Sequence, residues 1–213
     1  MEEISAIRKE YKLKELRKRD VNHNPFLQFN IWLDEALKAM VNEPTAMNFA
    51  TVSAQGRPSS RIVLLKGCTE DKLIFYTNYN SRKGTDLSQN PFAALTFFWP
   101  ELERQVRIEG RIFKVSKELS DDYFKSRPQS SQIGAMASPQ STIIYDRKVL
   151  EDLEENITKE LNGQQPERPA HWGGYYLSPD YFEFWQGRPS RLHDRIAFKK
   201  SAETAWEIVR LAP

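Results

Sequence analysis

Residues 182–195 read Phe182-Glu183-Phe184-Trp185-Gln186-Gly187-Arg188-Pro189-Ser190-Arg191-Leu192-His193-Asp194-Arg195: an aromatic run, a Gly/Pro turn and a cationic run. Because strand side chains alternate between two faces, the cationic run predicts Arg191, His193 and Arg195 on one face, with Leu192 and Asp194 opposite. Like charges this close repel one another unless an anion lies among them. With the flat apolar surface of Trp185 nearby, this stretch predicts a pocket for a planar, anionic, heteroaromatic ligand.

The composition indicates one globular domain with a real core. Of 213 residues, 39% are hydrophobic and 28% are charged, which is typical of soluble globular proteins. No apolar run reaches the roughly 20 residues that span a bilayer, and the acidic N-terminus does not have the pattern of a secretory signal. Cys68 is the only cysteine, which excludes an internal disulfide framework and favours a reducing cytoplasm.

Positive charge is concentrated near the N-terminus. The net charge is only +2, yet residues 8–19 contain Arg8, Lys9, Lys12, Lys14, Arg17, Lys18 and Arg19. We expect a basic helical segment over residues 1–20, followed by a single domain over residues 21–213. A basic amphipathic helix can bind nucleic acid or a membrane surface. Because no matching basic patch follows, we favour a solvated helix that lies over the domain and expect neither nucleic-acid nor membrane partners.

The rest of the chain predicts a mainly β fold with peripheral helices. Strands are expected over residues 46–53, 59–65, 73–77, 92–99, 104–115 and 205–211, in addition to those around residues 182–195. Helices are expected after Asn24, over residues 81–89, 117–126 and 146–161. Short, closely spaced antiparallel strands favour a small barrel over a parallel α/β sheet.

Two clusters suit anions. The first joins the strand from Arg61 to Lys66 with Tyr76-Thr77-Asn78 and with Ser81-Arg82-Lys83, which begins a helix where free amides favour a phosphate. The second consists of Tyr123, Arg127 and Ser131, spaced by four residues, although Pro128 is expected to break the helix between them. Each cluster alone is equally compatible with solvated strand ends or a capped surface helix.

Other kinds of site are not supported by the sequence. His23, His171 and His193 lie far apart without the spacing of a metal centre, and we expect no metal. His171-Trp172-Gly173-Gly174 is interpreted as a structural turn.

The organising stretch also fits a family signature. E-F-W-Q at 183–186, four residues and then R-L-H-D-R at 191–195 resemble the pyridoxamine/pyridoxine 5'-phosphate oxidase family. The resemblance runs from R-x-E-Y at residues 8–11 to the terminal R-L-A-P. Between them are R-I-V-L-L-K at 61–66, Y-T-N at 76–78, S-R-K at 81–83, E-R-Q-V at 103–106, S-R-P at 126–128 and S-Q-I-G at 131–134. Met136 and Pro139 depart from the pattern.

The resemblance implies an FMN-binding split β-barrel that forms a homodimer with FMN at the subunit interface. The implied FMN-binding residues are Arg61, Ile62, Val63, Leu64, Leu65, Lys66, Tyr76, Thr77, Arg82, Lys83, Gln105, Gln140, Ser141, Trp185 and Arg195. The implied substrate-binding residues are Arg8, Lys9, Glu10, Tyr11, Lys66, Tyr123, Arg127, Ser131, Arg191, Leu192 and His193, with Arg191 and His193 in the catalytic role.

The implied activity is oxidation of pyridoxamine 5'-phosphate or pyridoxine 5'-phosphate to pyridoxal 5'-phosphate. A hydride would pass to flavin N5, and O2 would reoxidise the flavin and give H2O2. The alternative is a non-catalytic split-barrel protein that binds FMN or pyridoxal phosphate. Two phosphate clusters together with the Arg-x-His-x-Arg run favour the oxidase.

Overall fold

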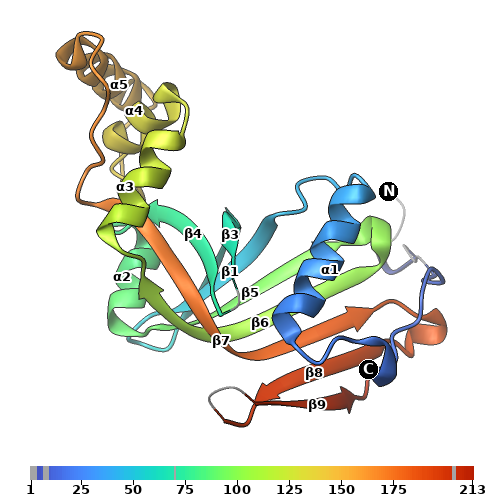
Figure 1. The fold of residues 1–213 in the computed structure, drawn as a ribbon. Coiled ribbons are helices and arrows are strands. Elements are labelled where there is room, and N and C mark those ends of the chain that lie inside the picture. The colour runs from blue at the N-terminus through green and yellow to red at the C-terminus, as the bar shows by residue number, and fades with distance from the viewer. Residues whose placement is uncertain (1–3, 7–9, 70, 203–204) are drawn as a thin grey trace.

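The fold is one antiparallel sheet that curves into a half-barrel (Figure 1). The computed structural model describes residues 4–6, 10–69, 71–202 and 205–213. The strands are β1 (Ala46–Val52), β2 (Pro58–Leu64), β3 (Gly67–Cys68), β4 (Leu73–Asn78), β5 (Phe92–Trp99), β6 (Arg104–Lys114), β7 (Trp172–Gln186), β8 (Asp194–Lys200) and β9 (Trp206–Leu211). Their order is β2-β1-β5-β6-β7-β4-β3, and β8 and β9 extend the sheet from β7. The expected mainly β architecture is therefore confirmed.

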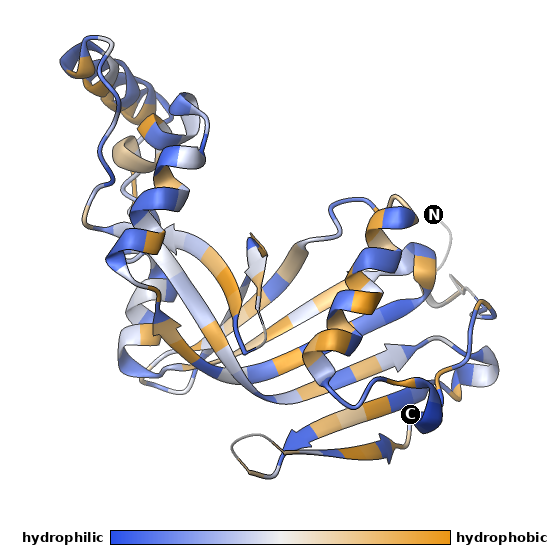
Figure 2. Ribbon diagram, in the orientation of Figure 1, coloured by the Kyte–Doolittle hydropathy of each residue, from blue (hydrophilic) through white to orange (hydrophobic). Residues whose placement is uncertain are grey.

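One face of the sheet is covered by α1 (Pro25–Lys38) (Figure 1). Asn24 caps this helix as expected, because its side chain accepts hydrogen bonds from the amides of Phe26 and Leu27. Phe29 packs on Phe97 of β5, and Trp32 packs edge-on against Phe184 of β7, with ring centroids 5.0 and 5.2 Å apart. Figure 2 shows hydrophobic residues alternating with hydrophilic ones along the strands, so the core lies between α1 and this face.

Four further helices lie at the other end of the sheet. α2 (Arg82–Gln89) and α3 (Lys117–Ser126) begin after Ser81 and Ser116, whose side chains accept the amide hydrogens of Gly84 and Leu119. α4 (Gln129–Ala137) and α5 (Lys148–Leu161) follow, and with α3 they project from the sheet as an arm (Figure 1). The break at Pro128 is confirmed, whereas α4 was not anticipated.

One local prediction within the organising stretch is wrong. Arg191 and His193 do not lie on a strand, because β8 begins only at Asp194 and a short 3-10 helix (Pro189–Arg191) precedes it. Ser190 and Arg191 have φ of 57° and 62°, which no strand residue adopts.

The expected turn at residues 171–174 is only partly present: His171 lies in a turn, but the three residues that follow it do not. Trp172 begins β7, and the two following glycines serve close packing: a Cβ on Gly173 would lie 2.2 Å from the Tyr79 hydroxyl.

The expected N-terminal helix is also wrong over most of its described length. Only Ile4–Ala6 and Lys18–Asp20 form short 3-10 helices, and residues 10–17 are non-helical. Ile4 and Leu13, apolar residues of this segment, are exposed, while Leu16 is buried. The backbone amides of Lys12, Leu13 and Leu16 donate to distant carboxylates instead of helical carbonyls.

None of the described helices is long and apolar enough to cross a membrane. Within the same part of the chain, no three His, Cys, Asp or Glu side chains are grouped so that they could hold a metal ion.

Candidate active site

A cationic pocket of about 560 Å³ lies between β2, β4 and the α3–α4 corner. It brings together the two clusters that the sequence separates: its lining includes Arg61, Ile62, Val63, Leu64, Lys66, Tyr76, Thr77, Lys83, Tyr123, Arg127, Ser131 and Gln140. Four of these residues are Lys or Arg, and none of the described residues that line the pocket is Asp or Glu. The pocket therefore suits a ligand with one or more anionic groups.

Lys83 extends from the first turn of α2 into the base of this pocket. Its ammonium group donates to Thr77 Oγ1 and Ser81 Oγ at 3.1 Å each and to Gln140 Oε1 at 2.7 Å. Burial, reinforced by Arg61, lowers the pKa of Lys83 to about 8. All three partners are uncharged, so an anion in the pocket would supply the counter-charge that Lys83 lacks.

Arg61 is held at the edge of β2 by a buried network. Its Nη1 donates to Thr51 Oγ1 at 2.7 Å and to the Phe49 carbonyl at 3.2 Å, and Thr51 in turn donates to Asp86 at 2.6 Å. Burial lowers the pKa of Arg61, although Asp86 partly opposes this shift. The network fixes the guanidinium, so the side chain is oriented before any ligand binds.

Stacked aromatic rings form another wall. Tyr76 and Tyr123 stack with centroids 3.7 Å apart, and the nearly parallel Trp172 ring lies beside them at 5.7 and 6.3 Å. The Arg127 guanidinium lies 4.6 Å from the Trp172 ring centroid. The Nη1 atom of Arg127 is buried and has no hydrogen-bond partner among the described residues. A buried guanidinium nitrogen without an acceptor is costly, so this atom is where an anionic oxygen fits best.

A second group lies on the sheet face opposite α1. Gln105, Trp185 and Arg195 are direct cross-strand neighbours on β6, β7 and β8, so their side chains form a row on one face. Figure 1 places β8 and β9 at the opposite end of the sheet from the α3–α5 arm. None of the described pockets contains members of both groups.

His193 packs beside this row. Its ring centroid lies 4.6 Å from that of Trp185, and Tyr11 contacts both rings edge-on at 5.7 and 5.9 Å. The backbone N–H of Arg188 donates to His193 Nδ1 at 3.1 Å. An amide can only donate, so Nδ1 carries no proton, and the proton of the neutral ring is on Nε2. Burial and the nearby Arg191 lower the pKa of His193, which favours this neutral form.

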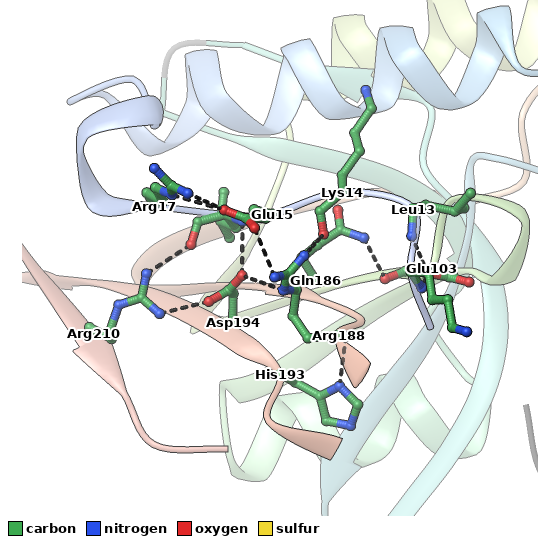
Figure 3. Close-up of polar contacts among 12 residues, drawn as sticks. Leu13, Lys14, Glu15, Arg17, Glu103, Gln186, Arg188, His193, Asp194 and Arg210 are labelled. Atoms are coloured by element: carbon green, nitrogen blue, oxygen red, sulfur yellow. Dashed lines mark hydrogen bonds and ion pairs between the residues drawn. The ribbon is translucent and has the colours of Figure 1, made fainter. Parts of the chain in front are cut away.

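Tyr11 belongs to an extended N-terminal strap, residues 10–17, whose backbone is bound by side chains of the sheet (Figure 3). The amides of Lys12 and Leu13 donate to Glu103 at 2.8 and 3.0 Å, and the Leu16 amide donates to Asp194 at 3.0 Å. A Cβ on Gly187 would lie 2.7 Å from Tyr11 Cγ, so glycine permits this close approach.

The basic side chains of the strap have acidic partners. Lys12 pairs with Glu10 at 2.7 Å, Lys14 with Glu35 at 3.0 Å, and Arg17 with Glu15. These pairs leave little unbalanced charge for a polyanion, which agrees with the expectation that the segment lies over the domain.

Known proteins resemble the whole of this chain. The family model described as pyridoxamine 5'-phosphate oxidase matches residues 33–158, and that of the pyridoxine 5'-phosphate oxidase C-terminal dimerisation region matches residues 172–213. The pyridoxine/pyridoxamine 5'-phosphate oxidase of Burkholderia mallei (strain SAVP1) is 54% identical over 100% of both chains. The chain belongs to the pyridoxamine 5'-phosphate oxidase family. A relative of the same name from Leptospira interrogans is 53% identical over 99% of this chain and 98% of its own.

Solved structures of the family share the fold. PhzG from Burkholderia lata 383, in complex with tetrahydrophenazine-1-carboxylic acid, has a TM-score of 0.88 at 28% identity and covers 94% of this chain and 99% of its own. An FMN-binding protein from Nostoc punctiforme has a TM-score of 0.71 at 17% identity, covering 89% and 97% of the two chains. The expected split β-barrel is therefore confirmed.

Several residues that the family signature implied lie outside the pocket and the row. Leu65 is buried in the core, whereas Glu10, Arg82, Ser141, Arg191 and Leu192 are exposed. Arg8 and Lys9 lie outside the described residues. Their roles in binding remain predictions.

Sequence reasoning missed other members of the site. The sequence predicts a turn at Trp172, yet its ring lies beside Tyr76 and Tyr123, at 5.7 and 6.3 Å. Thr51 and Asp86, which the sequence does not single out, orient Arg61. The sequence predicts no role for Glu183 beyond the E-F-W-Q motif, yet it binds Arg195. For Trp172 the signal was available, because two glycines after a tryptophan within an aromatic run also occur where strands pack closely.

Proposed function

We propose that this protein is an FMN-dependent oxidase that converts pyridoxamine 5'-phosphate and pyridoxine 5'-phosphate to pyridoxal 5'-phosphate. The observation that carries the proposal is the cationic pocket, which has four basic residues and a buried Arg127 nitrogen without an acceptor among the described residues. Full-length identity of 54% to an oxidase of that name supports the same substrates. With a single cysteine whose pKa burial raises to about 11, the chain also suits a reducing cytoplasm.

The residues present fit two phosphates. Lys83, in the first turn of α2, and Arg61, on β2, would bind the FMN phosphate, because both are pre-oriented cations that line the pocket and α2 begins with free amides. Lys66, Tyr123, Arg127 and Ser131 would bind the phosphate of the substrate, whose oxygen would satisfy Arg127 Nη1. FMN, when bound, supplies a hydride acceptor that O2 can reoxidise.

The protein's own groups would orient the substrate ring. His193, protonated at Nε2, would donate a hydrogen bond to the hydroxyl oxygen that the pyridine ring of the substrate carries. Arg191 would add positive charge beside it, and Tyr11 would shield the ring from water. His193 therefore holds a proton at Nε2 and does not accept one there in its neutral form.

We also propose a homodimer in which the row Gln105, Trp185 and Arg195 of one subunit completes the cationic pocket of the other. Within one chain these two groups belong to separate parts of the sheet. The row shares its face with exposed Ile62, Leu64 and Phe98, and such an apolar surface favours a protein interface. The matched dimerisation region, residues 172–213, includes Trp185 and Arg195.

Anaerobic mixing tests the activity. Protein loaded with FMN is mixed with pyridoxamine 5'-phosphate without oxygen, and the flavin absorbance is followed. We expect bleaching, then recovery of the absorbance and release of H2O2 when O2 is admitted. Bound FMN that is not bleached by either phosphate ester would indicate the non-catalytic binder instead.

Two variants test the phosphate site. Arg127→Gln should raise KM for pyridoxamine 5'-phosphate by roughly 10- to 100-fold, because a charge-assisted contact is lost. Lys125→Gln, a nearby exposed lysine that does not line the cationic pocket, should behave like the wild type. Equal KM values for both variants would contradict this site.

Subunit complementation tests the shared site. Arg127→Ala and His193→Ala each disable one group, so each homodimer should be nearly inactive when assayed at a substrate concentration far below its raised KM. Co-expression produces mixed dimers in which one of the two sites is intact, and about a quarter of wild-type activity should return. No recovery would contradict a site built from both subunits.

A further inference from the structure

Glu183 is a buried carboxylate on the sheet face that carries Trp185 and Arg195. Only 2% of this residue is exposed, yet its carboxylate accepts four hydrogen bonds. Two come from Arg195, one comes from Arg107 Nη1 at 3.2 Å, and one comes from the Tyr181 hydroxyl at 3.0 Å. A buried carboxylate needs such donors, so Glu183 and its cations form one unit.

Arg195 is fixed almost completely by this unit. Its Nε and Nη2 donate to the two oxygens of Glu183 at 2.9 and 3.1 Å, and its Nη1 donates to the Ala212 carbonyl at 2.7 Å. A guanidinium group has five N–H donors. The two that are left, one on each terminal nitrogen, point away from these acceptors, so Arg195 can present them to a ligand without reorganisation.

Charges alternate along this face. Arg195, Glu183, Arg107 and Glu109 follow one another, with ion pairs at 2.9, 3.2 and 2.5 Å. Glu183 therefore both aims the guanidinium of Arg195 and cancels part of its positive field. Glu109, at the far end, contacts Arg107 and, among the described residues, makes no ion pair with Arg195.

We propose that Glu183 is a positioning residue for the flavin: it holds Arg195 beside Trp185 and limits the positive charge that Arg195 presents to the bound ring. This inference rests on the proposed FMN-dependent function. Reduced flavin carries more negative charge than oxidised flavin, so a cation beside the ring favours reduction and a neutralised cation favours it less. The Glu183–Arg195 pair would thereby set both the affinity for FMN and its midpoint potential.

Glu183→Gln and its matched control Glu109→Gln test this role. FMN is titrated into each apoprotein by fluorescence, and the midpoint potential of the bound flavin is measured by dye equilibration. Because glutamine replaces one carboxylate oxygen with an NH2 group, which is a donor, the contact of Arg195 with two oxygens is lost, and we expect E183Q to bind FMN about tenfold more weakly. We also expect a more positive midpoint potential, because a negative charge is removed. E109Q should match the wild type in both measurements.

Combining the change with Arg195→Gln separates positioning from simple support of the fold. If Glu183 acts through Arg195, adding E183Q to the Arg195→Gln protein should weaken FMN binding by less than about twofold. Glu183→Asp, which keeps the charge but shortens the side chain, serves if E183Q does not fold: it should weaken FMN binding while the potential stays close to that of the wild type.

Equal losses of affinity in the two backgrounds would overturn the proposal, as would an E183Q protein with the wild-type affinity and potential. A wild-type protein that binds no FMN would refute the proposed function and this role with it. If the wild-type protein binds FMN normally, the results for the Glu183 variants bear on this role alone and not on the proposed function.

Discussion

The backbone N–H of Arg188 and Nδ1 of His193 are hydrogen-bonded at 3.1 Å, and this contact determines where the imidazole proton lies. Protonation of Nδ1 would place two donors face to face, so the neutral ring keeps its proton on Nε2. His193 is thus prepared to donate a hydrogen bond, and the sequence alone could not distinguish this role from that of a base.

His193→Gln should therefore retain much of the activity. The glutamine amide can place an N–H close to the position of Nε2–H, so we expect kcat/KM within about tenfold of the wild type, whereas His193→Leu should lose considerably more. Steady-state kinetics on both variants measures the difference. Equal, large losses in the two would instead identify His193 as the proton acceptor.

The lowered pKa of Lys83 predicts that the affinity for FMN depends on pH. This pKa is lowered to about 8, so the ammonium is charged below that pH and largely neutral above it. Binding of a phosphate above pH 8 must then take up a proton, and affinity should fall by up to about tenfold per pH unit. Titrations of the apoprotein with FMN at pH 7, 8 and 9 measure this slope.

Lys83→Arg is the control, because its guanidinium stays charged across this range and the slope should disappear. The lowered pKa of Lys83 also affects the stability of the apoprotein. Between pH 8 and the ordinary value of 10.5 the unfolded chain binds more protons at this site, so Lys83 makes the folded apoprotein more stable as pH rises. An FMN affinity that is constant from pH 7 to 9 would contradict the assignment of Lys83 to the phosphate.

Local rules explain which elements could be predicted from the sequence. Asn24, Ser81 and Ser116 all cap helices where expected, because capping depends on the few residues that follow. The clusters around Arg61 and Arg127 also meet in one pocket, since β2, β4 and α3 carry them to the same end of the sheet.

The two errors have different physical causes. Alternation predicts Arg191 and His193 on a strand, but Pro189 and the left-handed Ser190 interrupt it before β8 begins, so a local break prevails over the alternating pattern. Helix propensity could not reveal that Glu103 would bind the amides of Lys12 and Leu13. There a tertiary contact overrides the local preference.

Glu103→Gln should loosen the N-terminal strap without unfolding the domain. Its carboxylate accepts the amides of Lys12 and Leu13, and weakening these charge-assisted bonds should cost about 1–3 kcal/mol locally. Hydrogen exchange at residues 12 and 13 should accelerate, while the amides of β6 and β7 keep their protection. Glu101→Gln is a matched control, because Glu101 is exposed and its carboxylate accepts a long bond, 3.4 Å, from the Asn42 amide. Unchanged exchange at residues 12 and 13 would refute the anchoring role.

Asp194 also binds the strap, and its pKa predicts the pH range over which the strap stays attached. Although burial opposes it, the Leu16 amide and Arg210 hold the pKa of Asp194 below its ordinary value of 3.8. A lowered carboxyl pKa stabilises the folded protein above pH 3.8, and this contribution is lost as pH falls through the lower folded value. The strap should therefore stay bound at pH 5, which hydrogen exchange of the Leu16 amide measures. Rapid exchange of this amide at pH 5 would mean that residues 10–17 are released and that Asp194 does not hold them.

Gly84 and Gly134 should respond in opposite ways to alanine. Both lie within helices, where alanine is favoured over glycine by about 1 kcal/mol. At Gly134 a Cβ meets nothing within 4 Å, so Gly134→Ala should raise the free energy of unfolding by about 0.5–1 kcal/mol. At Gly84 a Cβ would lie 1.9 Å from the Tyr79 carbonyl oxygen, so Gly84→Ala must move backbone and displace α2, which carries Lys83. Denaturant unfolding of both variants, with FMN titration of each, measures stability and the phosphate site together. A Gly134→Ala protein that is destabilised would show that a second subunit packs against α4. A Gly84→Ala protein with normal stability and FMN affinity would show that the contact between α2 and Tyr79 is not needed to place Lys83.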